Sequence, residues 1–400
     1  MTILLFGYLN FTAPRAYNQS GKLQGAPFFN SPDEAVNFWS AAQIAGGTLP
    51  IMVIPTELTD YKYLDPRSTE LRWSEGTPIA IVPTGFLGFS FLAGIIAWSF
   101  FGILWLTPIA AAFAAWALFN VAKNFVGNKA ATYSFFILTF LSPWLYYSMR
   151  GQFNNVLFTA FWLGGVACLA RFAKKSANTE LIGLLGSFLF FALAIFIRPS
   201  EASWIILCLI IFFMLSRHFV ALRRGTLFII GLGLVFIGTI YLNGVLRGGF
   251  DGGVGYSALG SAQTGIMAKL LPFGFHPRAI AVNIYHIFFL NLWWLTLPAL
   301  GGLIILAKNN LKSRLKGGEY LSVNAKNLAF SIGAGFVWLI VLYGSWRTFD
   351  TPSSAQTITI GNAHMRYWLP IIIVFLPFAF YFIEYVSGLA RRQFGMALRV

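Results

Sequence analysis

Nine long apolar runs follow one another through the last three quarters of the 400-residue sequence, and they constrain its fold more than any other feature. Each run is close to the ~17–25 residues that an α-helix needs to cross a bilayer. Their bounds are 102–122, 130–147, 155–171, 180–197, 201–216, 226–246, 287–307, 328–346 and 367–386. A chain that is 57% hydrophobic and 10% charged could not keep this apolar surface from water in a soluble fold. The sequence therefore predicts an all-α polytopic membrane protein with about nine to ten transmembrane helices.

The first 100 residues differ from the remainder of the chain. Residues 1–12 are apolar but about half as long as a span requires, and they lack a signal-peptide pattern. We interpret them as part of a first transmembrane helix that begins before this sequence. Residues 13–100 are predicted to be an outer loop with interfacial helices. Pro83 and three glycines interrupt the apolar stretch from Ile79 to Ser99, so we interpret this stretch as a helix that lies in the outer interface and does not span the membrane. Residues 101–400 are predicted to form the transmembrane bundle.

Basic residues gather in alternate connections between the apolar runs and indicate the orientation of the chain. In this topology, one side of the membrane carries 16 of the 28 Lys and Arg residues and three of the 13 acids. Such an excess of positive charge marks the cytoplasmic side. We therefore expect a cytoplasmic C-terminus and place residues 13–77, with seven acids, on the outer face of the cytoplasmic membrane. The net charge of +15 has the same explanation, and no nucleic-acid partner is expected.

Two adjacent carboxylates, Asp33 and Glu34, stand at the predicted start of a helix in this outer segment. Ser31 and Pro32 suit the N-cap and first-turn positions, and the acids complement the positive end of the helix dipole. The pair could simply stabilise an interfacial helix. In an outer-facing site a carboxylate could also act as a general base, so Asp33 and Glu34 are the candidate catalytic residues.

Several polar side chains are predicted at the outer ends of the spans, where they converge on one face of the membrane. The candidates for substrate binding are Arg150, Asn154, Asn155, Arg198, His276, His364 and Arg366. An arginine at this depth can hold a phosphate through two parallel hydrogen bonds, or it can be an interfacial anchor. The histidines could equally be solvated loop residues. Arg366, directly before the last apolar run, is the first candidate for a phosphate ligand.

These motifs resemble the GT-C class of integral-membrane glycosyltransferases, in particular the branch of protein mannosyltransferases and lipid A aminoarabinose transferases. The resemblance covers most of the chain and depends on the order and common outer position of five short motifs. They are SPDEA at 31–35, the Phe-Gly pair at 101–102, LSPWLYYSMRGQFNN at 141–155, IRPSEA at 197–202 and HMRYWLP at 364–370.

The resemblance implies a sugar donor linked to a polyprenyl phosphate and an inverting transfer centred on an acid of the first outer loop. That acid corresponds to Asp33, with Glu34 as its neighbour. Basic outer residues would grip the lipid phosphate, and the acceptor would be a lipid, a glycan or a protein. Related proteins usually carry an acid in the second outer loop, where this sequence has Asn154 and Asn155. No cofactor is assigned, and the need for a divalent metal stays open.

Other classes of membrane protein remain as alternatives. The sequence has no P-loop, Rossmann fingerprint, HExxH or GxSxG pattern, so chemistry based on these motifs is not indicated. A lipid-linked saccharide transporter or flippase could use the same basic residues, but it would need ionisable residues near the middle of the spans. A polymerase or ligase of surface polysaccharide would also face outward, but usually carries its large outer loop late in the chain.

Overall fold

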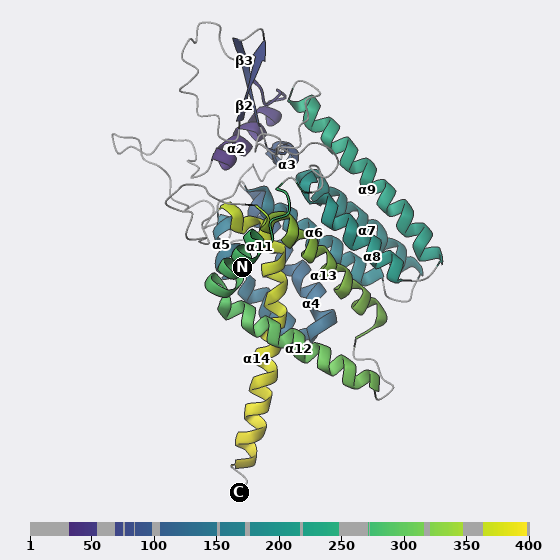
Figure 1. The fold of residues 1–400 in the computed structure, drawn as a ribbon. Helices are drawn as coiled ribbons and strands as arrows, with labels where there is room; N and C mark the ends of the chain where they lie inside the picture. The colour runs from purple at the N-terminus through teal and green to yellow at the C-terminus, as the bar shows by residue number, and fades with distance from the viewer. Residues whose placement is uncertain are drawn as a thin grey trace, which may run out of the picture.

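Helices pack side by side in the computed structural model and form a bundle that runs from α4 to α14 (Figure 1). The structure describes residues 32–53, 69–74, 77–83, 85–97, 105–149, 153–172, 177–216, 219–247, 271, 273–315, 321–346 and 363–397. The bundle consists of α4 Leu106–Leu138, α5 Ser142–Met149, α6 Asn154–Phe172, α7 Ala177–Ile197, η3 Pro199–Glu201, α8 Ala202–Leu215, α9 Phe219–Leu246, α11 Pro277–Ile284, η5 Tyr285–Asn291, α12 Trp293–Leu315, α13 Val323–Gly344, η6 Ala363–Trp368 and α14 Leu369–Ala397.

The predicted class, a helical polytopic membrane protein, is confirmed, since each apolar run overlaps one or more helices of the bundle. Among the described residues, five helices are long and apolar enough to cross a membrane. Counting each of two bent helix pairs as one span raises the number to seven. This is fewer than expected because α4 contains parts of two predicted spans and α8 has only 14 residues. The predicted helix at residues 1–12 lies outside the described residues.

A break inside α4 separates two of the predicted spans. Gly127 has φ 81° and ψ 172°, a left-handed conformation that glycine adopts without the steric cost of a side chain. It lies between residues 122 and 130, where the sequence indicated a basic turn at the cytoplasmic end of the bundle. Lys129, just beyond the break, forms an ion pair of 3.5 Å with Glu384 of α14. The structure therefore has a kink at Gly127, at the position where the basic residues indicated a turn between two spans.

A small unit, here called the cap, covers one end of the bundle (Figure 1). It contains α2 Pro32–Ala45, β1 Met52–Val53, β2 Thr69–Ser74, β3 Thr77–Pro83 and α3 Gly88–Ala97. The strands form an antiparallel sheet in the order β1-β3-β2, in which Leu71 pairs with Ile81. Helices were expected in this segment, whereas the sheet was not.

The strands correct the prediction of a helix from Ile79 to Ser99. The helix begins only at Gly88, and residues 79–83 belong to β3. The residues of β2 and β3 include Trp73, Ile79 and Ile81, which fit a pleated surface well. Antiparallel pairing with only two residues between the strands satisfies their backbone groups, so the apolar stretch does not need to be helical.

The cap is attached to the bundle through α3. Gly88 lies so close to α7 that an added Cβ would be 2.0 Å from the backbone oxygen of Phe196. The end of α9 holds the residues just before α3: Asn243 Oδ1 accepts a hydrogen bond of 2.8 Å from the backbone N–H of Leu87. The Arg247 side chain donates one of 2.6 Å to the carbonyl of Gly85. These contacts fix α3 over the ends of α7 and α9.

The other helix of the cap, α2, packs on α3. An added Cβ at Gly94 of α3 would meet the backbone oxygen of Ala41 and the side chain of Ile44, each at 2.9 Å. Ser90 Oγ donates a hydrogen bond of 3.1 Å to the carbonyl of Asn37. Small residues on α3 thus let α2 approach closely, and α2 in turn carries Asp33 at its start.

Replacing Gly88 should release the cap from the bundle. Gly88→Ala places a methyl group against the backbone of α7, which cannot move aside as a flexible side chain can, so we expect a loss of about 1–3 kcal/mol in stability. Gly85→Ala is the matched control, because nothing lies within 4 Å of an added Cβ there. The thermal unfolding midpoint of both variants in detergent is the measurement, and equal midpoints would contradict this packing.

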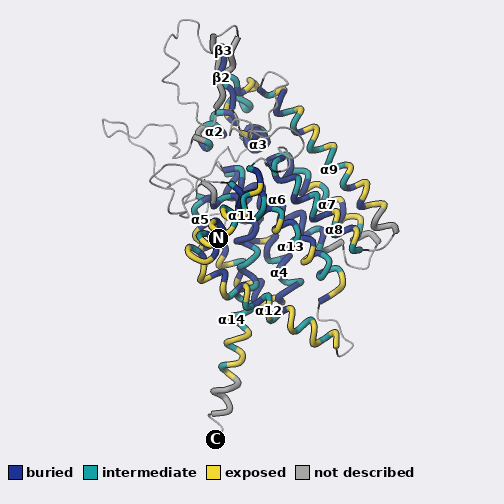
Figure 2. Tube along the Cα trace, viewed as in Figure 1, coloured by how far each residue is buried: buried dark blue, intermediate teal, exposed yellow. Residues whose placement is uncertain are grey.

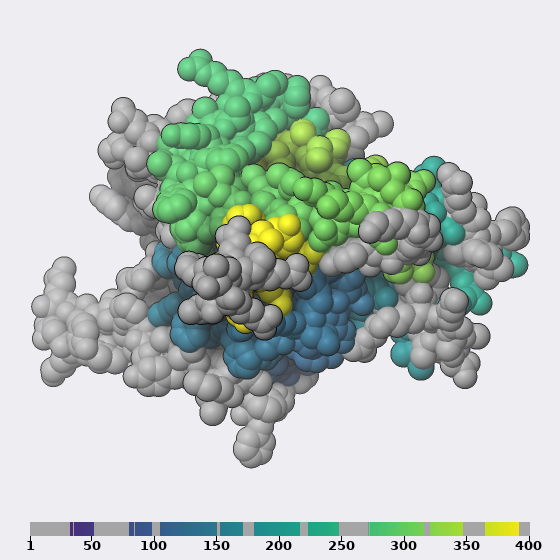
Figure 3. Space-filling model, turned by 90° about the horizontal axis from the view of Figure 1, so that it is seen from below, coloured from purple at the N-terminus to yellow at the C-terminus, as the bar shows by residue number. Residues whose placement is uncertain are grey.

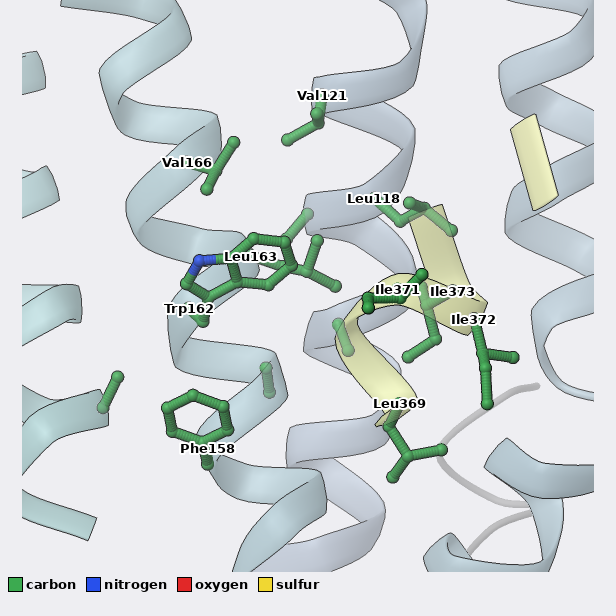
Figure 4. Close-up of a cluster of buried hydrophobic side chains, with 14 of the residues drawn as sticks. Leu118, Val121, Phe158, Trp162, Leu163, Val166, Leu369, Ile371, Ile372 and Ile373 are labelled. Carbon is green, nitrogen blue, oxygen red and sulfur yellow. The ribbon is translucent and has the colours of Figure 1, made fainter. Parts of the chain in front are cut away.

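The core of the bundle centres on α6. Figure 4 shows Phe158, Trp162, Leu163 and Val166 of this helix, with side chains from α4 and from the start of α14 on the facing side. Trp162 is 1% exposed, and its ring contacts those of Trp204 in α8 and Phe336 in α13 at centroid distances of 5.4 Å and 5.7 Å. Close packing around α6 therefore fixes the positions of the helix ends that carry polar residues.

The outer surface of the bundle carries many exposed apolar side chains, as expected for a surface that contacts lipid. In Figure 2, exposed residues run along α9 and occur along the described part of α14 that extends below the bundle. The exposed side chains of α9 include Leu227, Ile230, Leu234 and Ile237. In water these side chains would be unfavourably exposed, whereas in a bilayer they face hydrocarbon.

The cap and the C-terminal end of α14 lie at opposite ends of the bundle (Figure 1). Figure 3 looks at the bundle from below, where the end of α14 stands between the green helices and the blue helix α4. This arrangement agrees with the expectation that the outer segment and the C-terminus lie on opposite sides of the membrane.

Candidate active site

The ends of five helices meet beneath the cap and bring most of the candidate polar residues together. The N-terminal ends of α6, α8 and α14 and the C-terminal ends of α7 and α13 contribute to this cluster through hydrogen bonds and ring contacts. The helices end here because Pro199 interrupts the chain after α7 and a short 3₁₀ helix, η6, precedes α14. In membrane proteins, charged side chains near helix ends can reach the membrane interface.

Asp33 and Arg366 form an ion pair that joins the cap to the bundle. Asp33 lies in the first turn of α2, and Arg366 lies in η6. The distance between Asp33 Oδ2 and an Nη of Arg366 is 2.7 Å, and their side chains are 35% and 12% exposed. The residue predicted as the base and the residue predicted to bind phosphate are therefore in direct contact. Glu34 is only 2% exposed, so Asp33 is the more accessible of the two carboxylates.

The Arg366 guanidinium lies close to two aromatic rings, and its Nε makes no hydrogen bond among the described residues. Its carbon is 5.0 Å from the ring centroid of Phe153 and 5.2 Å from that of Tyr367. An Nη donates a hydrogen bond of 3.2 Å to the Tyr367 hydroxyl. Among the described residues, the buried Nε of Arg366 has no hydrogen-bond partner. A buried donor of this kind is costly unless an acceptor reaches it, so an oxygen-bearing ligand would be stabilised here.

Arg198 is held in a separate network of buried polar groups. It forms an ion pair of 2.7 Å with Glu201, and each side chain is 3% exposed. Arg198 also donates to Asn154 Oδ1 at 3.1 Å and to the Tyr343 hydroxyl at 3.3 Å. The Glu201 carboxylate accepts further hydrogen bonds from the Tyr343 hydroxyl and from the Trp204 indole, at 2.5 Å and 2.7 Å. Each nitrogen of the Arg198 guanidinium thus has a partner within the protein.

The two asparagines of the second outer segment support the two arginines. Asn154 Oδ1 accepts from Arg198, and Asn155 Nδ2 donates to the backbone oxygen of Arg366 at 3.2 Å. Asn155 is 2% exposed, and among the described residues its Oδ1 has no hydrogen-bond partner. The neutral amides therefore link α6 to both arginines at the position where the resemblance implied an acid.

Of the three remaining candidates, the structure describes the surroundings of His276 only. His276 is half-buried, and its backbone N–H donates to Ser345 Oγ at 3.2 Å, directly before α11. Phe273, three residues earlier, stacks on Trp346 at a centroid distance of 4.9 Å and lies 6.2 Å from the ring of Tyr343 in the cluster. His364 lies in η6, two residues before Arg366, but its side chain is outside the described part of the structure. Arg150 lies outside the described residues altogether.

Sequence reasoning did not pair the two arginines with their aromatic and acidic partners. Glu201 follows Arg198 at a spacing of three residues, and this spacing was a readable signal for a pair near the start of a helix. Tyr343 and Tyr367 lie in apolar runs, where a tyrosine is difficult to distinguish from an interfacial anchor. Their rings stack at a centroid distance of 4.6 Å, so the pair became evident only from the structure.

Metal binding is not assigned by the described part of the structure. Within these residues, no group of three or more His, Cys, Asp or Glu side chains is arranged to hold a metal ion.

The bundle and the cap, with the polar cluster at their junction, have the fold seen in integral-membrane proteins of the GT-C type. A family model described as dolichyl-phosphate-mannose-protein mannosyltransferase matches residues 83–241, from the end of β3 through most of α9. Crystal structures of ArnT from Cupriavidus metallidurans share the fold at 12% sequence identity. The TM-score is 0.51 for the apo state and 0.54 for the state bound to undecaprenyl phosphate. The resemblance expected from the sequence is thereby confirmed.

The alignment with ArnT covers 99% of this chain and 62% of the ArnT chain in the apo state, or 61% in the bound state. This chain thus spans less than two thirds of the length of the ArnT structures it matches. No curated protein sequence matches the chain.

Proposed function

We propose that the chain is a membrane glycosyltransferase that moves a sugar from a polyprenyl-phosphate donor to an acceptor at the outer face of the cytoplasmic membrane. The observation that supports this most directly is the contact between Asp33 and Arg366 at the end of the bundle. It brings a carboxylate and a guanidinium, the two groups that the proposed reaction needs, to one place at the end of the bundle. A structural relative, ArnT, is described as bound to undecaprenyl phosphate, a ligand of the proposed donor class.

Arg366 is the phosphate ligand in this proposal. Its guanidinium has a buried Nε without a partner among the described residues, and its only ion pair among them is with Asp33. Arg198 is a weaker candidate, because each of its nitrogens already bonds within the protein. The phosphate of an incoming donor would bind the Arg366 guanidinium beside the Asp33 carboxylate or would displace that carboxylate from it.

The reaction then follows from the two roles. The Asp33 carboxylate accepts the proton of the acceptor hydroxyl, and the acceptor oxygen forms a bond to the anomeric carbon of the sugar. The bond between that carbon and the phosphate oxygen breaks, and the electron pair leaves with the polyprenyl phosphate. Arg366 stabilises the charge that develops on the departing phosphate. Attack opposite the leaving group inverts the anomeric centre, as the resemblance implied.

Transfer can be tested with the protein reconstituted in liposomes. A panel of polyprenyl-phosphate-linked sugars should yield free polyprenyl phosphate when lipid, glycan and peptide acceptors are supplied, and nucleotide-linked sugars should not react. Labelled donor should remain in its leaflet. Equilibration of labelled donor between the leaflets without release of polyprenyl phosphate would favour the transporter class and overturn the proposal.

The outward orientation is tested separately by labelling of cysteines in intact cells. Thr48→Cys in the cap should react with a membrane-impermeant maleimide, whereas Ser387→Cys in α14 should react only after permeabilisation, because the two lie at opposite ends of the bundle. Thr48 is exposed, and the native Cys208 is buried, which limits background at that position. The reverse pattern of labelling would place the site in the cytoplasm.

A further inference from the structure

We infer that Glu201 is a positioning residue for Arg366 and acts on it through Arg198, Tyr343 and Tyr367. The inference rests on the proposed function, since it assumes that Arg366 binds the phosphate of the donor. It adds an acid that contacts neither Asp33 nor Arg366 in the described structure but controls the geometry of the phosphate site.

Glu201 lies at the centre of a buried hydrogen-bond network that holds its carboxylate in one orientation. Its carboxylate oxygens accept from Arg198, from the Tyr343 hydroxyl and from the Trp204 indole. Buried charges are stable only when they are paired and their remaining hydrogen-bonding positions are satisfied. This arrangement fixes both the Arg198 guanidinium and the Tyr343 ring with respect to α8.

Tyr367 connects this network to Arg366. Its ring stacks on Tyr343 at a centroid distance of 4.6 Å and an interplanar angle of 18°. The Arg198 guanidinium carbon lies 4.9 Å from the same ring centroid. Tyr367 is 7% exposed, so its ring cannot turn without displacing these neighbours.

The hydroxyl of Tyr367 then orients the proposed phosphate ligand. It accepts a hydrogen bond of 3.2 Å from the Arg366 Nη that also pairs with Asp33. A fixed hydroxyl sets the plane of the guanidinium, and with it the direction of the unpartnered Nε. Binding of a phosphate through parallel hydrogen bonds depends on that plane. Glu201 therefore acts on donor binding through its hold on Tyr343 and Arg198.

A double-mutant cycle tests the inference, with binding of undecaprenyl phosphate to the reconstituted protein as the readout. Glu201→Gln keeps the volume of the side chain and removes its charge, so it should raise the dissociation constant by ~10-fold, the scale of one hydrogen bond to a charged group. In an Arg366→Lys background, which lacks the planar fork, the same change should raise the constant by less than ~2-fold, because coupled residues are not additive. Equal effects in both backgrounds would show that Glu201 has a structural role only, and would overturn the inference.

Two further variants keep the outcome decisive. Tyr343→Phe retains the stack on Tyr367 and removes the hydroxyl that bonds to Glu201. It should raise the dissociation constant less than Glu201→Gln does, and this rise should also shrink in the Arg366→Lys background. This variant replaces Glu201→Gln in the cycle if Glu201→Gln does not fold. Asn120→Ala removes a buried amide in α4 that bonds to Trp116 and Lys123, and it should leave the dissociation constant unchanged. If Arg366→Lys alone leaves the constant unchanged, the phosphate site of the proposed function is wrong and this inference falls with it.

Discussion

Asp33→Asn should lower sugar transfer by ~10²- to 10⁴-fold, the usual loss when a general base is removed. The asparagine has nearly the same volume, and α2 should form as before. The variant should also bind undecaprenyl phosphate at least as well as the wild type, because it removes the carboxylate that lies 2.7 Å from Arg366 and competes with the phosphate. Loss of turnover together with unchanged or tighter donor binding is the signature of the proposed base.

The neighbouring acid supplies the control for this variant. Glu34→Gln makes the same chemical change in the same helical turn, but Glu34 is buried, so it should reduce transfer much less. The rate of transfer and the dissociation constant of undecaprenyl phosphate should be measured for both variants. Equal rates for Asp33→Asn and the wild type would remove Asp33 from the reaction.

Arg366→Ala should raise the KM for the donor by ~30-fold or more, the lower end of the cost of truncating one member of a buried charge pair. Arg366→Lys should raise it by ~10-fold, because lysine keeps the charge but loses the planar arrangement of donors. The alanine variant also leaves Asp33 without its ion-pair partner, so its effect includes the altered position of the carboxylate.

Arg278 provides a matched control for Arg366. It is an exposed arginine at the start of α11, at the same end of the bundle, and Arg278→Ala should leave the KM for the donor unchanged. Initial rates at varied donor concentration in liposomes give both values. If Arg366→Lys behaves like the wild type, Arg366 is an interfacial anchor and the phosphate must bind elsewhere.

The bundle could be predicted from the sequence because lipid imposes a simple rule on the backbone. A long apolar run in a bilayer must satisfy its backbone groups internally, so each run becomes a helix. Basic residues beside Gly127 likewise marked a break between two apolar runs, although the left-handed conformation of Gly127 and the kink in α4 became visible only in the structure. The same rule does not apply outside the membrane, and the short apolar stretch of β3 paired with β2 instead of forming the expected helix.

The candidate site was predicted in part for a similar reason. Charged residues at helix ends are few in this sequence, so Asp33, Arg198 and Arg366 stood out, and the structure brings Asp33 into contact with Arg366. Their neighbours could not be found in this way. Tyr343 and Tyr367 are separated by 23 intervening residues, most of which lie outside the described structure, and their stacking depends on how α13 and η6 pack.

The proposed site is divided between the cap and the bundle, so the two parts could change independently during evolution. Asp33 belongs to the cap, whereas Arg366 and its supporting residues belong to the bundle. The matched family region, residues 83–241, excludes α2 and most of the sheet. Among the described residues, the cap meets the bundle at Gly88, at the end of α9 and at the ion pair between Asp33 and Arg366. A chimera that carries a relative's cap on this bundle should therefore retain its choice of donor and change its choice of acceptor.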